Sequence, residues 1–448
     1  MGVLDSKLDL IIKKSHKIGS EYETAAEDSP IADAANLILE YGIKARASDI
    51  HLEPREDALV VRFRVDGILQ SDDKLPKNLS APIALHIKNL CNLKTTENRV
   101  PQNGMFRFVA AGKVYTLKVS TLPIQDGEKL VVKVLDESKK DLSLQQLGFW
   151  GHSLKSLNAA IKQSRGLVII SGPTDSGKTA TLYQILNSLN NPDVCISTIE
   201  DPVEYKISSI NQSQVNLKAD VTMADGLCAL LRQDANIVMV GDIRDYETAD
   251  LTTHAALTGR LVFAAINSVK ASDYFARMSA MGVEPYLTAS VTRTVVNQHL
   301  IRKLCPDCKK SYKPNKAEYQ AVMAALCIDA NLESTQIEQL ESMAIDQGVG
   351  ADSGKTASFT NGVITKMWRA KGCDACGHSG YKGRTTVNEV LVNSESIQHL
   401  VMCKAPTNEI RAEAKKEGMV TLKMDAFVKA LRGETSVDEL LKLARVLN

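Results

Sequence analysis

The sequence lacks two features that would attach or export it. It contains no apolar run approaching the roughly 20 residues that span a bilayer. Its N-terminus does not show the charged and then apolar plan of a secretory signal. We therefore expect a cytoplasmic protein, and a membrane-bound partner is compatible with this expectation.

An excess of positive charge, the usual mark of a nucleic-acid-binding protein, is also missing. The chain has 54 Lys and Arg against 53 Asp and Glu, which leaves a formal net charge of +1. This balance gives no electrostatic footprint for a nucleic acid, so we expect none among the partners. The nine cysteines are odd in number and scattered, which argues against a disulfide framework.

The length of 448 residues is too great for one hydrophobic core, so two or three domains are expected. In the carboxyl-terminal part, short all-apolar runs alternate with helical stretches, as in a doubly wound parallel sheet whose strands are covered on both faces. These runs are Leu167–Ile170, Cys195–Ile199, Ile237–Val240 and Leu261–Ala265. The predicted fold class is therefore α/β.

A smaller α+β domain is expected before this sheet. Residues 31–39 have the pattern of an amphipathic helix. Leu59–Gly67 alternates and then turns, as a hairpin strand does, and Val114–Ser120 and Lys129–Leu135 are further strand candidates. Ahead of this domain, apolar residues at helical spacing within residues 1–25 fit either a short surface helix or a docking helix for a partner.

One segment matches the phosphate-binding pattern G-x-x-x-x-G-K-[ST] in full. It follows the apolar run that ends at Ile170 and opens a helix that begins at Ala180, the strand–loop–helix order that the motif requires. Its residues are Gly172, Pro173, Thr174, Asp175, Ser176, Gly177, Lys178 and Thr179. Backbone amides and the helix N-terminus would hold the phosphates of ATP, Lys178 the β- and γ-phosphates, and Thr179 the Mg²⁺ ion.

A second, incomplete copy of the motif occurs later in the chain. Asp352–Ala357 repeats the hexapeptide Asp175–Ala180 letter for letter. Here Val349 stands at the position of the first glycine, and no apolar strand precedes it. We therefore reject this copy as a nucleotide site.

Four carboxylates follow apolar strands downstream of the loop. Asp242 ends the run Ile237–Val240, and Glu200, Asp201 and Glu204 follow the run Cys195–Ile199. In P-loop enzymes such groups lie near Mg²⁺ or the attacking water. Each alone is also a common cap of a strand or turn, but together with the loop they form a set of catalytic candidates.

Two C-x₂-C pairs need a separate explanation. Cys305, Cys308, Cys373 and Cys376 provide four thiolates at the spacing of a structural Zn²⁺ site. A redox pair is the rival interpretation, but neither pair lies at a thioredoxin-like helix start. We expect a zinc element.

With these residues in view, the chain resembles the ATPase family that drives type II secretion and type IV pilus assembly. The resemblance covers nearly all of the chain from Pro30 onward, and four-cysteine elements are found in the assembly and secretion members of that family but not in its pilus retraction motors. The matching segments are Ala47–Pro54, Arg64–Gly67, Pro101–Gly104, Gly127–Lys129, Thr198–Tyr205 and Leu231–Ala249. The resemblance implies a RecA-like core, a homo-hexamer, nucleotide between the two domains of a subunit, and an inner-membrane platform and cytoplasmic assembly proteins as partners.

Several catalytic positions depart from the family pattern. Asp242 replaces a glutamate, and Arg260 and Asn267 replace two histidines. Lys118 and Lys133 stand where the family has arginines that reach the γ-phosphate, and they lose the planar fork that grips phosphate.

A sixth departure is Asp175, which occupies a loop position that is usually glycine. Nucleotide binding should survive these changes, whereas hydrolysis is expected to be slow unless Arg260 or the lysines restore the charge. The predicted function is an ATP-hydrolysing motor for pilin or pseudopilin assembly; the alternative is a nucleotide-binding regulatory or structural paralogue with little or no turnover.

The expected organisation has six parts. They are an N-terminal helix or tail at 1–29, an α+β domain at 30–136, a linker at 137–150, a P-loop ATPase core at 151–300, a four-cysteine zinc element at 301–393 with a polar insertion at 327–362, and C-terminal helices at 394–448. The insertion shows no convincing strand and is expected to be a loop.

Overall fold

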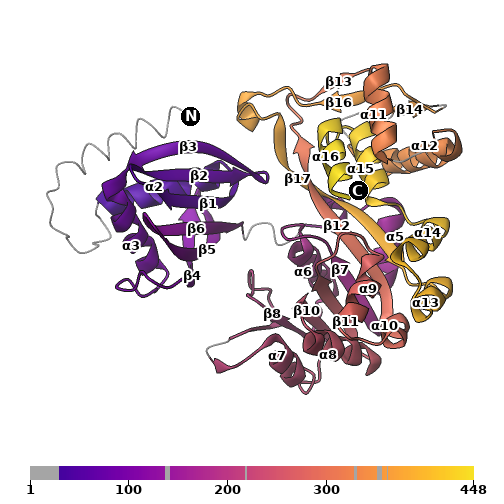
Figure 1. Ribbon diagram of the computed structural model, residues 1–448, viewed down its shortest axis with the longest axis horizontal. Coiled ribbons are helices and arrows are strands. Elements are labelled where there is room, and N and C mark those ends of the chain that lie inside the picture. The colour runs from indigo at the N-terminus through magenta and orange to yellow at the C-terminus, as the bar shows by residue number, and fades with distance from the viewer. Residues whose placement is uncertain are drawn as a thin grey trace. The chain divides into compact units, whose positions relative to one another are not determined.

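The computed structural model describes residues 30–136, 142–216, 219–326, 330–350, 356–360 and 362–447. It contains two compact units that divide between residues 139 and 140 (Figure 1). The predicted N-terminal helix or tail at 1–29 lies outside the described residues, as do residues 352–355 of the incomplete second motif.

The first unit is a six-stranded antiparallel sheet with the order β3-β2-β1-β6-β5-β4 and two helices packed on one face (Figure 1). Its elements are α2 (Pro30–Lys44), β1 (Ala47–Pro54), β2 (Ala58–Val65), β3 (Ile68–Pro76), η1 (Lys77–Leu79), α3 (Ser80–Leu90), β4 (Gln102–Ala110), β5 (Lys113–Ile124) and β6 (Gly127–Asp136).

The alternation read from the sequence explains this sheet. Leu59, Val61 and Phe63 of β2 point into the core beneath the helices. Asp66 and Gly67 have φ of 49° and 87°, the left-handed pair that a tight hairpin turn between β2 and β3 requires. The predicted helix, hairpin and strands of this unit are confirmed.

A buried carboxylate ties three strands of this sheet together. Glu53 of β1 is 2% exposed and accepts from Arg62 of β2 at 2.7 Å. Lys129 of β6 lies 2.9 Å and Arg55 3.0 Å from the same carboxylate. Burial alone would raise the pKa of Glu53, but the hydrogen bonds from Arg62 and Lys129 lower it to about 2.

The second unit contains a seven-stranded sheet of order β17-β12-β7-β11-β10-β8-β9 within the described residues. All neighbours in it are parallel except β12 and β17. The strands are β7 (Gly166–Ser171), β8 (Ile196–Glu200), β9 (Asn211–Gln214), β10 (Ile237–Ile243), β11 (Leu261–Ile266), β12 (Thr292–Leu304) and β17 (Tyr381–Val392). The mixed α/β class with a parallel sheet is confirmed.

Helices cover both faces of this sheet, which explains the all-apolar strands. Leu167 and Ile169 of β7 belong to one core, and Val168 and Ile170 to the core on the opposite face. The helices before the four-cysteine element are α4 (Leu144–Leu147), α5 (Gly151–Ile161), α6 (Lys178–Leu189), α7 (Met223–Leu230), α8 (Tyr246–Leu257), α9 (Asp273–Ala280) and α10 (Pro285–Val291).

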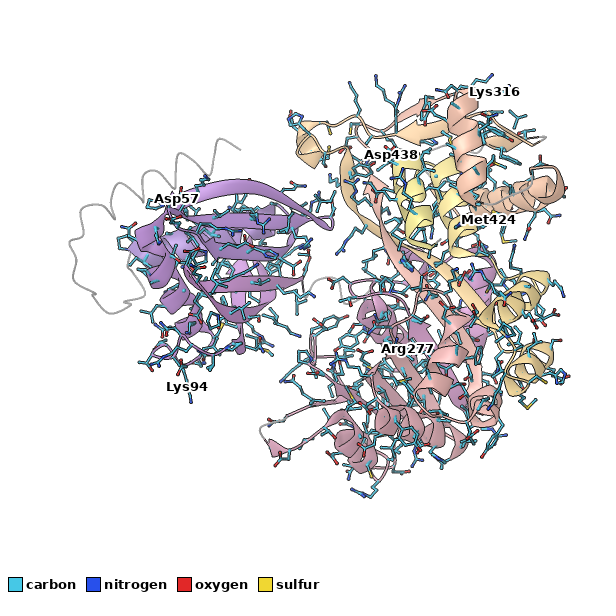
Figure 2. All side chains as sticks on the ribbon, viewed as in Figure 1. Asp57, Lys94, Arg277, Lys316, Met424 and Asp438 are labelled. Carbon is cyan, nitrogen blue, oxygen red and sulfur yellow. The ribbon has the colours of Figure 1, made fainter. Side chains whose placement is uncertain are left out.

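The remaining elements form the carboxyl-terminal part of this unit. Met424, labelled in Figure 2, is one of the buried side chains that join its helices. The elements are β13 (Lys310–Tyr312), α11 (Lys316–Leu326), α12 (Ala330–Asp346), β14 (Phe359–Thr360), β15 (Val363–Ile364), β16 (Met367–Arg369), η5 (Asp374–Cys376), α13 (Glu395–Met402), α14 (Thr407–Lys416), α15 (Leu422–Leu431) and α16 (Val437–Leu447).

The structure differs from the sequence prediction in three places. The predicted linker at 137–150 contains α4, and Leu144 and Phe149 are buried in a core of the second unit. The predicted boundary at residue 300 falls inside β12, a 13-residue strand whose partner β17 also lies in the predicted zinc element. The prediction of a strandless loop at 327–362 is wrong, because α12 and β14 occupy much of it. Ile337, Leu340 and Ala344 of α12 are buried at helical spacing in a core, a pattern that many polar neighbours had obscured.

The helices of the described ranges were also compared with the dimensions of a bilayer. Among them, we find none that combines the length and the apolar character needed to cross one.

The network around Glu53 gives a pH-dependent prediction. We expect Glu53→Gln to lower the free energy of unfolding by about 1–3 kcal/mol at neutral pH, because three cations lose their charged partner. The native pKa of about 2 lies below the ordinary value of 4.5, so this contribution is present above pH 4.5 and is lost as the pH falls from 4.5 towards 2. Urea unfolding of both chains from neutral to acidic pH measures it, with the exposed Glu56→Gln as control. A difference that does not change with pH would contradict the account.

Candidate functional site

The segment Gly172–Thr179 lies at the carboxyl end of β7 and leads into α6. The two neighbours of β7 are β11 on one side and β12 on the other, although β8 to β10 intervene in the chain. This is a topological switch point, where open parallel sheets bind ligands beyond the carboxyl ends of the strands. The loop therefore occupies the position in the sheet that favours a ligand.

Three residues give this loop its shape through left-handed backbone conformations. Gly172 and Gly177 have φ of 149° and 90°. A Cβ atom on Gly172 would lie 2.3 Å from the carbonyl oxygen of Gln298, so only glycine fits there. Asp175 has φ of 59°, which aspartate tolerates better than most side chains and which accounts for its presence at a position usually held by glycine.

A buried amide from β12 supports the loop from beneath. Gln298 is fully buried, and its Nε2 donates to the carbonyl oxygen of Ser176 at 2.9 Å. Its Oε1 accepts from the hydroxyl of Thr181, in the first turn of α6, at 2.9 Å. Gln298 thus fixes the loop to the helix that follows it.

Lys178 lies against the loop itself. Its Nζ donates to the carbonyl oxygens of Gly172 at 3.0 Å and Pro173 at 2.9 Å, and to Oδ1 of Asn267 at 2.9 Å. Burial lowers the pKa of Lys178, and the negative charges of Asp242 and Asp175 oppose that shift. A cation therefore stands at the mouth of a loop whose backbone can receive an anion.

The two residues that replace histidines lie at opposite ends of strand β11. Asn267 directly follows β11 and contacts Lys178, whereas Arg260 precedes β11. The six residues of β11, at about 3.3 Å each, separate these two ends by about 20 Å. Arg260 donates to the carbonyl oxygen of Leu231 and to the hydroxyl of Thr258, both at 2.8 Å. It therefore does not restore charge at the loop.

Two of the predicted carboxylates meet through an arginine. Arg244 donates to Asp242 at 2.8 Å and to Asp201 at 3.2 Å, which joins the ends of β10 and β8. The other oxygen of Asp242, Oδ1, is buried without a hydrogen-bond partner, and so is the hydroxyl of Ser176. Orphaned buried polar atoms of this kind point to a missing water or ion.

The other two carboxylates belong to a different environment. Glu200 is 2% exposed and accepts from Tyr183 of α6, from Thr198 and from Gln212. Burial raises its pKa, and these neutral donors oppose the shift. Glu204 is half-buried, and its backbone N–H donates to the hydroxyl of Tyr183 at 3.1 Å.

Lys118 and Lys133 belong to the first unit. They face each other across β5 and β6 as register partners, and Asp49 of β1 is opposite Lys133. Both lysines are half-buried and alternate with core residues such as Leu117 and Val132, so they lie on the face that the helices do not cover. The structure brings these two predicted residues together.

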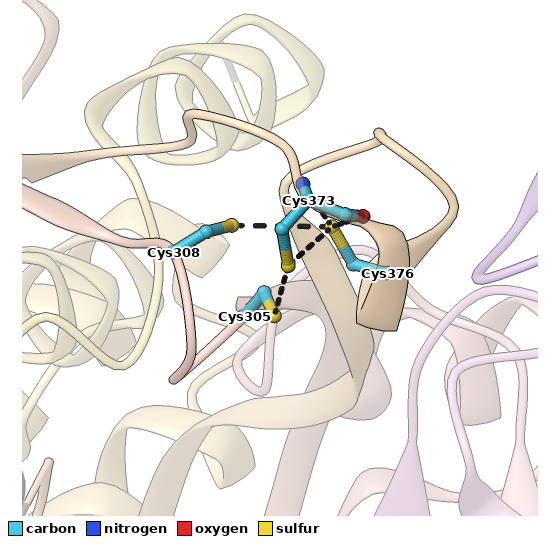
Figure 3. A group of neighbouring side chains, drawn as sticks. All are labelled: Cys305, Cys308, Cys373 and Cys376. Atoms are coloured by element: carbon cyan, nitrogen blue, oxygen red, sulfur yellow. Dashed lines mark hydrogen bonds between the residues drawn. The ribbon is translucent and has the colours of Figure 1, made fainter.

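The four cysteines also come together, from chain segments far apart in sequence (Figure 3). The Sγ atoms of Cys305 and Cys373 are 3.9 Å apart, those of Cys308 and Cys376 3.9 Å, and those of Cys373 and Cys376 3.7 Å. Four sulfurs held about 2.3 Å from one tetrahedral zinc ion would lie about 3.8 Å from each other. The donor set fits this ion.

Backbone amides assist the same cluster. The N–H groups of Cys373 and Gly380 donate to Sγ of Cys376 at 3.2 Å each. Burial would raise the pKa of Cys376, but these hydrogen bonds, together with those from the thiols of Cys373 and Cys308, outweigh it and lower the pKa to about 6. Such donors favour the thiolate form that metals bind.

Sequence reasoning missed Gln298, Tyr183 and Gln212. Gln298 had one local signal, since Asn297, Gln298 and His299 stand between the apolar pairs Val295–Val296 and Leu300–Ile301, and a buried amide in such a place needs partners. The partners themselves are more than a hundred residues away, because 122 positions separate Ser176 from Gln298. No local pattern could identify them.

The support from Gln298 can be tested without a ligand. We expect Gln298→Leu to lower the free energy of unfolding by about 1–3 kcal/mol, because the carbonyl of Ser176 and the hydroxyl of Thr181 lose their partner. Amide hydrogen exchange across the loop should accelerate at the same time. The exposed Gln320→Leu serves as control, and unchanged exchange in Gln298→Leu would show that the amide does not hold the loop.

Comparison with known proteins gives a consistent result. The chain is 35% identical over 419 residues to the type II secretion system ATPase E of Vibrio cholerae, covering 94% of this chain and 76% of that protein. It is 37% identical over 422 residues to the type IV pilus assembly ATPase PilB of Myxococcus xanthus, covering 94% and 69%.

A solved structure shares the fold. The Legionella pneumophila ATPase DotB matches with a TM-score of 0.61 at 17% identity, covering 94% of this chain and 98% of DotB. The family model described as type II/IV secretion system protein matches residues 24–442. The chain therefore belongs to the type II/IV secretion system protein family.

Proposed function

We propose that this chain is an ATPase motor that drives assembly of pilin or pseudopilin subunits in type IV pilus biogenesis or type II secretion. One observation carries the proposal: a strand, a glycine-bounded loop and a helix at the switch point of a parallel sheet, with Lys178 at the loop. Relatives named as type II secretion and type IV pilus assembly ATPases support it.

The residues of the loop fit the phosphates of ATP and a Mg²⁺ ion. Lys178 would exchange the carbonyls of Gly172 and Pro173 for the β- and γ-phosphates, and the loop amides would donate to phosphate oxygens. The hydroxyls of Ser176 and Thr179 and the unpartnered Oδ1 of Asp242 are the oxygen donors suited to magnesium and its water shell. Mg²⁺, when bound, would neutralise charge on the phosphates.

The carboxylates then take different roles. Asp242 and Asp201, joined by Arg244, would orient water or the ion. Glu204, which is half-buried, is the candidate residue for orienting the attacking water. Asp242 is one methylene shorter than the usual glutamate, and a misplacement of about 1 Å can cost about 100-fold in rate. We therefore propose slow turnover. The predicted action of Lys118 and Lys133 on the γ-phosphate stays a prediction.

A second candidate function rests on the bond between Lys178 and Asn267. A neutral amide replaces a histidine there and holds the lysine that should act on phosphate. With the short Asp242, this favours a nucleotide-binding regulatory or structural paralogue with little or no turnover.

Assembly and location complete the proposal. We propose a cytoplasmic homo-hexamer, built as a RecA-like motor and attached peripherally to the inner membrane through platform and cytoplasmic assembly proteins. The match to assembly and secretion relatives over 94% of the chain supports this arrangement.

Phosphate release with Mg²⁺-ATP separates the two functions. We expect measurable turnover by the purified full chain and background release from Lys178→Ala, because the loop loses the cation that holds the phosphates. Lys162→Ala, a change at an exposed lysine, should match the native chain. Tight ATP binding without any turnover by the native chain would contradict the motor and support the paralogue.

We also propose that Cys305, Cys308, Cys373 and Cys376 hold a structural zinc ion. Metal analysis of the purified chain should find about one zinc ion per chain, since four thiolates complete a tetrahedral site. Cys376→Ala should lower both the zinc content and the unfolding temperature, whereas Cys403→Ala, at an exposed thiol outside the cluster, should change neither. Equal zinc content in the native chain and Cys376→Ala would contradict the site.

A further inference from the structure

The loop that follows β8 is fastened to the helix that follows the phosphate-binding loop. The hydroxyl of Tyr183 in α6 donates to Glu200 and accepts from the backbone N–H of Glu204 at 3.1 Å. Tyr183 is fully buried, and its ring packs edge-on against Tyr205 with centroids 4.6 Å apart. Both the hydroxyl and the ring of Tyr183 therefore contact the loop between β8 and β9, residues 201–210, which we call the acidic loop.

A glutamine from the edge strand β9 closes this unit. Nε2 of Gln212 donates to Glu200 at 3.2 Å and to the carbonyl oxygen of Tyr205 at 3.1 Å. Its Oε1 accepts from the backbone N–H of Ile207 at 2.8 Å. Gln214, two residues along the same strand, accepts from the backbone N–H of Val203 at 3.2 Å. Two of the four polar side chains of β9 therefore hold the backbone of the loop.

The chemistry of Glu200 sets it apart from the other carboxylates. Tyr183 donates to its Oε2, and Thr198 and Gln212 donate to its Oε1, so both oxygens are occupied. These three donors are neutral. By contrast, Asp201 and Asp242 share an arginine, and Asp242 keeps one oxygen unpartnered. Glu200 is therefore built to hold neighbours in place.

We propose that Tyr183, Glu200 and Gln212 are positioning residues that keep the loop bearing Asp201 and Glu204 in register with the phosphate-binding helix. Binding of phosphate and Mg²⁺ at Lys178 and Thr179, at the start of α6, thereby affects the position of the acidic loop through the buried hydroxyl of Tyr183. Asn190, after the end of α6, adds a second tie by donating to the carbonyl oxygen of Ser208 at 2.8 Å. This inference rests on the proposed ATPase function and gives Glu200 a positioning role.

Tyr183→Phe removes one oxygen atom and keeps the ring. The variant leaves Glu204 N–H without its acceptor and Glu200 without one donor. We expect kcat for ATP to fall about 10- to 100-fold while KM changes by less than about twofold, because the acidic loop moves and the phosphate loop does not. Tyr274→Phe is the matched control, since Tyr274 is fully buried and its hydroxyl contacts Thr292, outside the site.

Hydrogen exchange supplies a readout that does not need turnover. In the native chain, added ADP should slow amide exchange in both 172–183 and 203–207. In Tyr183→Phe, exchange at 203–207 should be faster and ADP should slow exchange only in 172–183. Tyr274→Phe should behave like the native chain in both segments.

The two readouts keep the inference and the proposed function apart. If the native chain shows no turnover but ADP still slows exchange in both segments, the ATPase function is contradicted and the positioning role of Tyr183, Glu200 and Gln212 is retained. If Tyr183→Phe has the native kcat and the native response of exchange to ADP in both segments, the positioning role is contradicted and the ATPase function is retained.

Discussion

The hydrogen bonds of one buried amide hold the central geometry of this protein. Gln298 joins β12 to the loop after β7 and to the first turn of α6, so the loop cannot change shape without disturbing a strand in the interior of the sheet. The same strand approaches Gly172 so closely that no side chain fits there. Rigid support of this kind is what a loop needs if its amides are to converge on phosphate with little reorganisation.

The sheet also decides which substitutions matter. Asn267 follows β11 and Asp242 lies near the carboxyl end of β10, so both lie at the same end of the parallel strands as the loop proposed to bind phosphate. Arg260 precedes its strand and is committed to a carbonyl at the opposite edge. In the sequence these residues are equivalent departures from the family pattern, whereas the direction of the parallel strands shows that they lie at different ends of the strands. Slow turnover is therefore the outcome that we expect from this chain.

The features that could be predicted from the sequence are those formed by residues close together in the chain. The apolar runs, the hairpin at Asp66 and Gly67 and the phosphate-loop motif all carry their signal within a few residues. It did not predict β12 and β17, the helix α12, or the residues that brace the site, because Gln298, Tyr183 and Gln212 acquire their roles from partners that only the fold brings close. The four cysteines are an intermediate case, since their types and pairing pointed to zinc and the structure supplied the mutual distances.

The most direct test of the account is a crystal structure of the chain with Mg²⁺ and a non-hydrolysable ATP analogue. The account predicts that Nζ of Lys178 leaves the carbonyls of Gly172 and Pro173 for the β- and γ-phosphates, that Asp242 approaches the ion or its water, and that both bonds of Gln298 remain. An analogue bound elsewhere, or a Lys178 still held by the loop carbonyls beside bound phosphates, would contradict it.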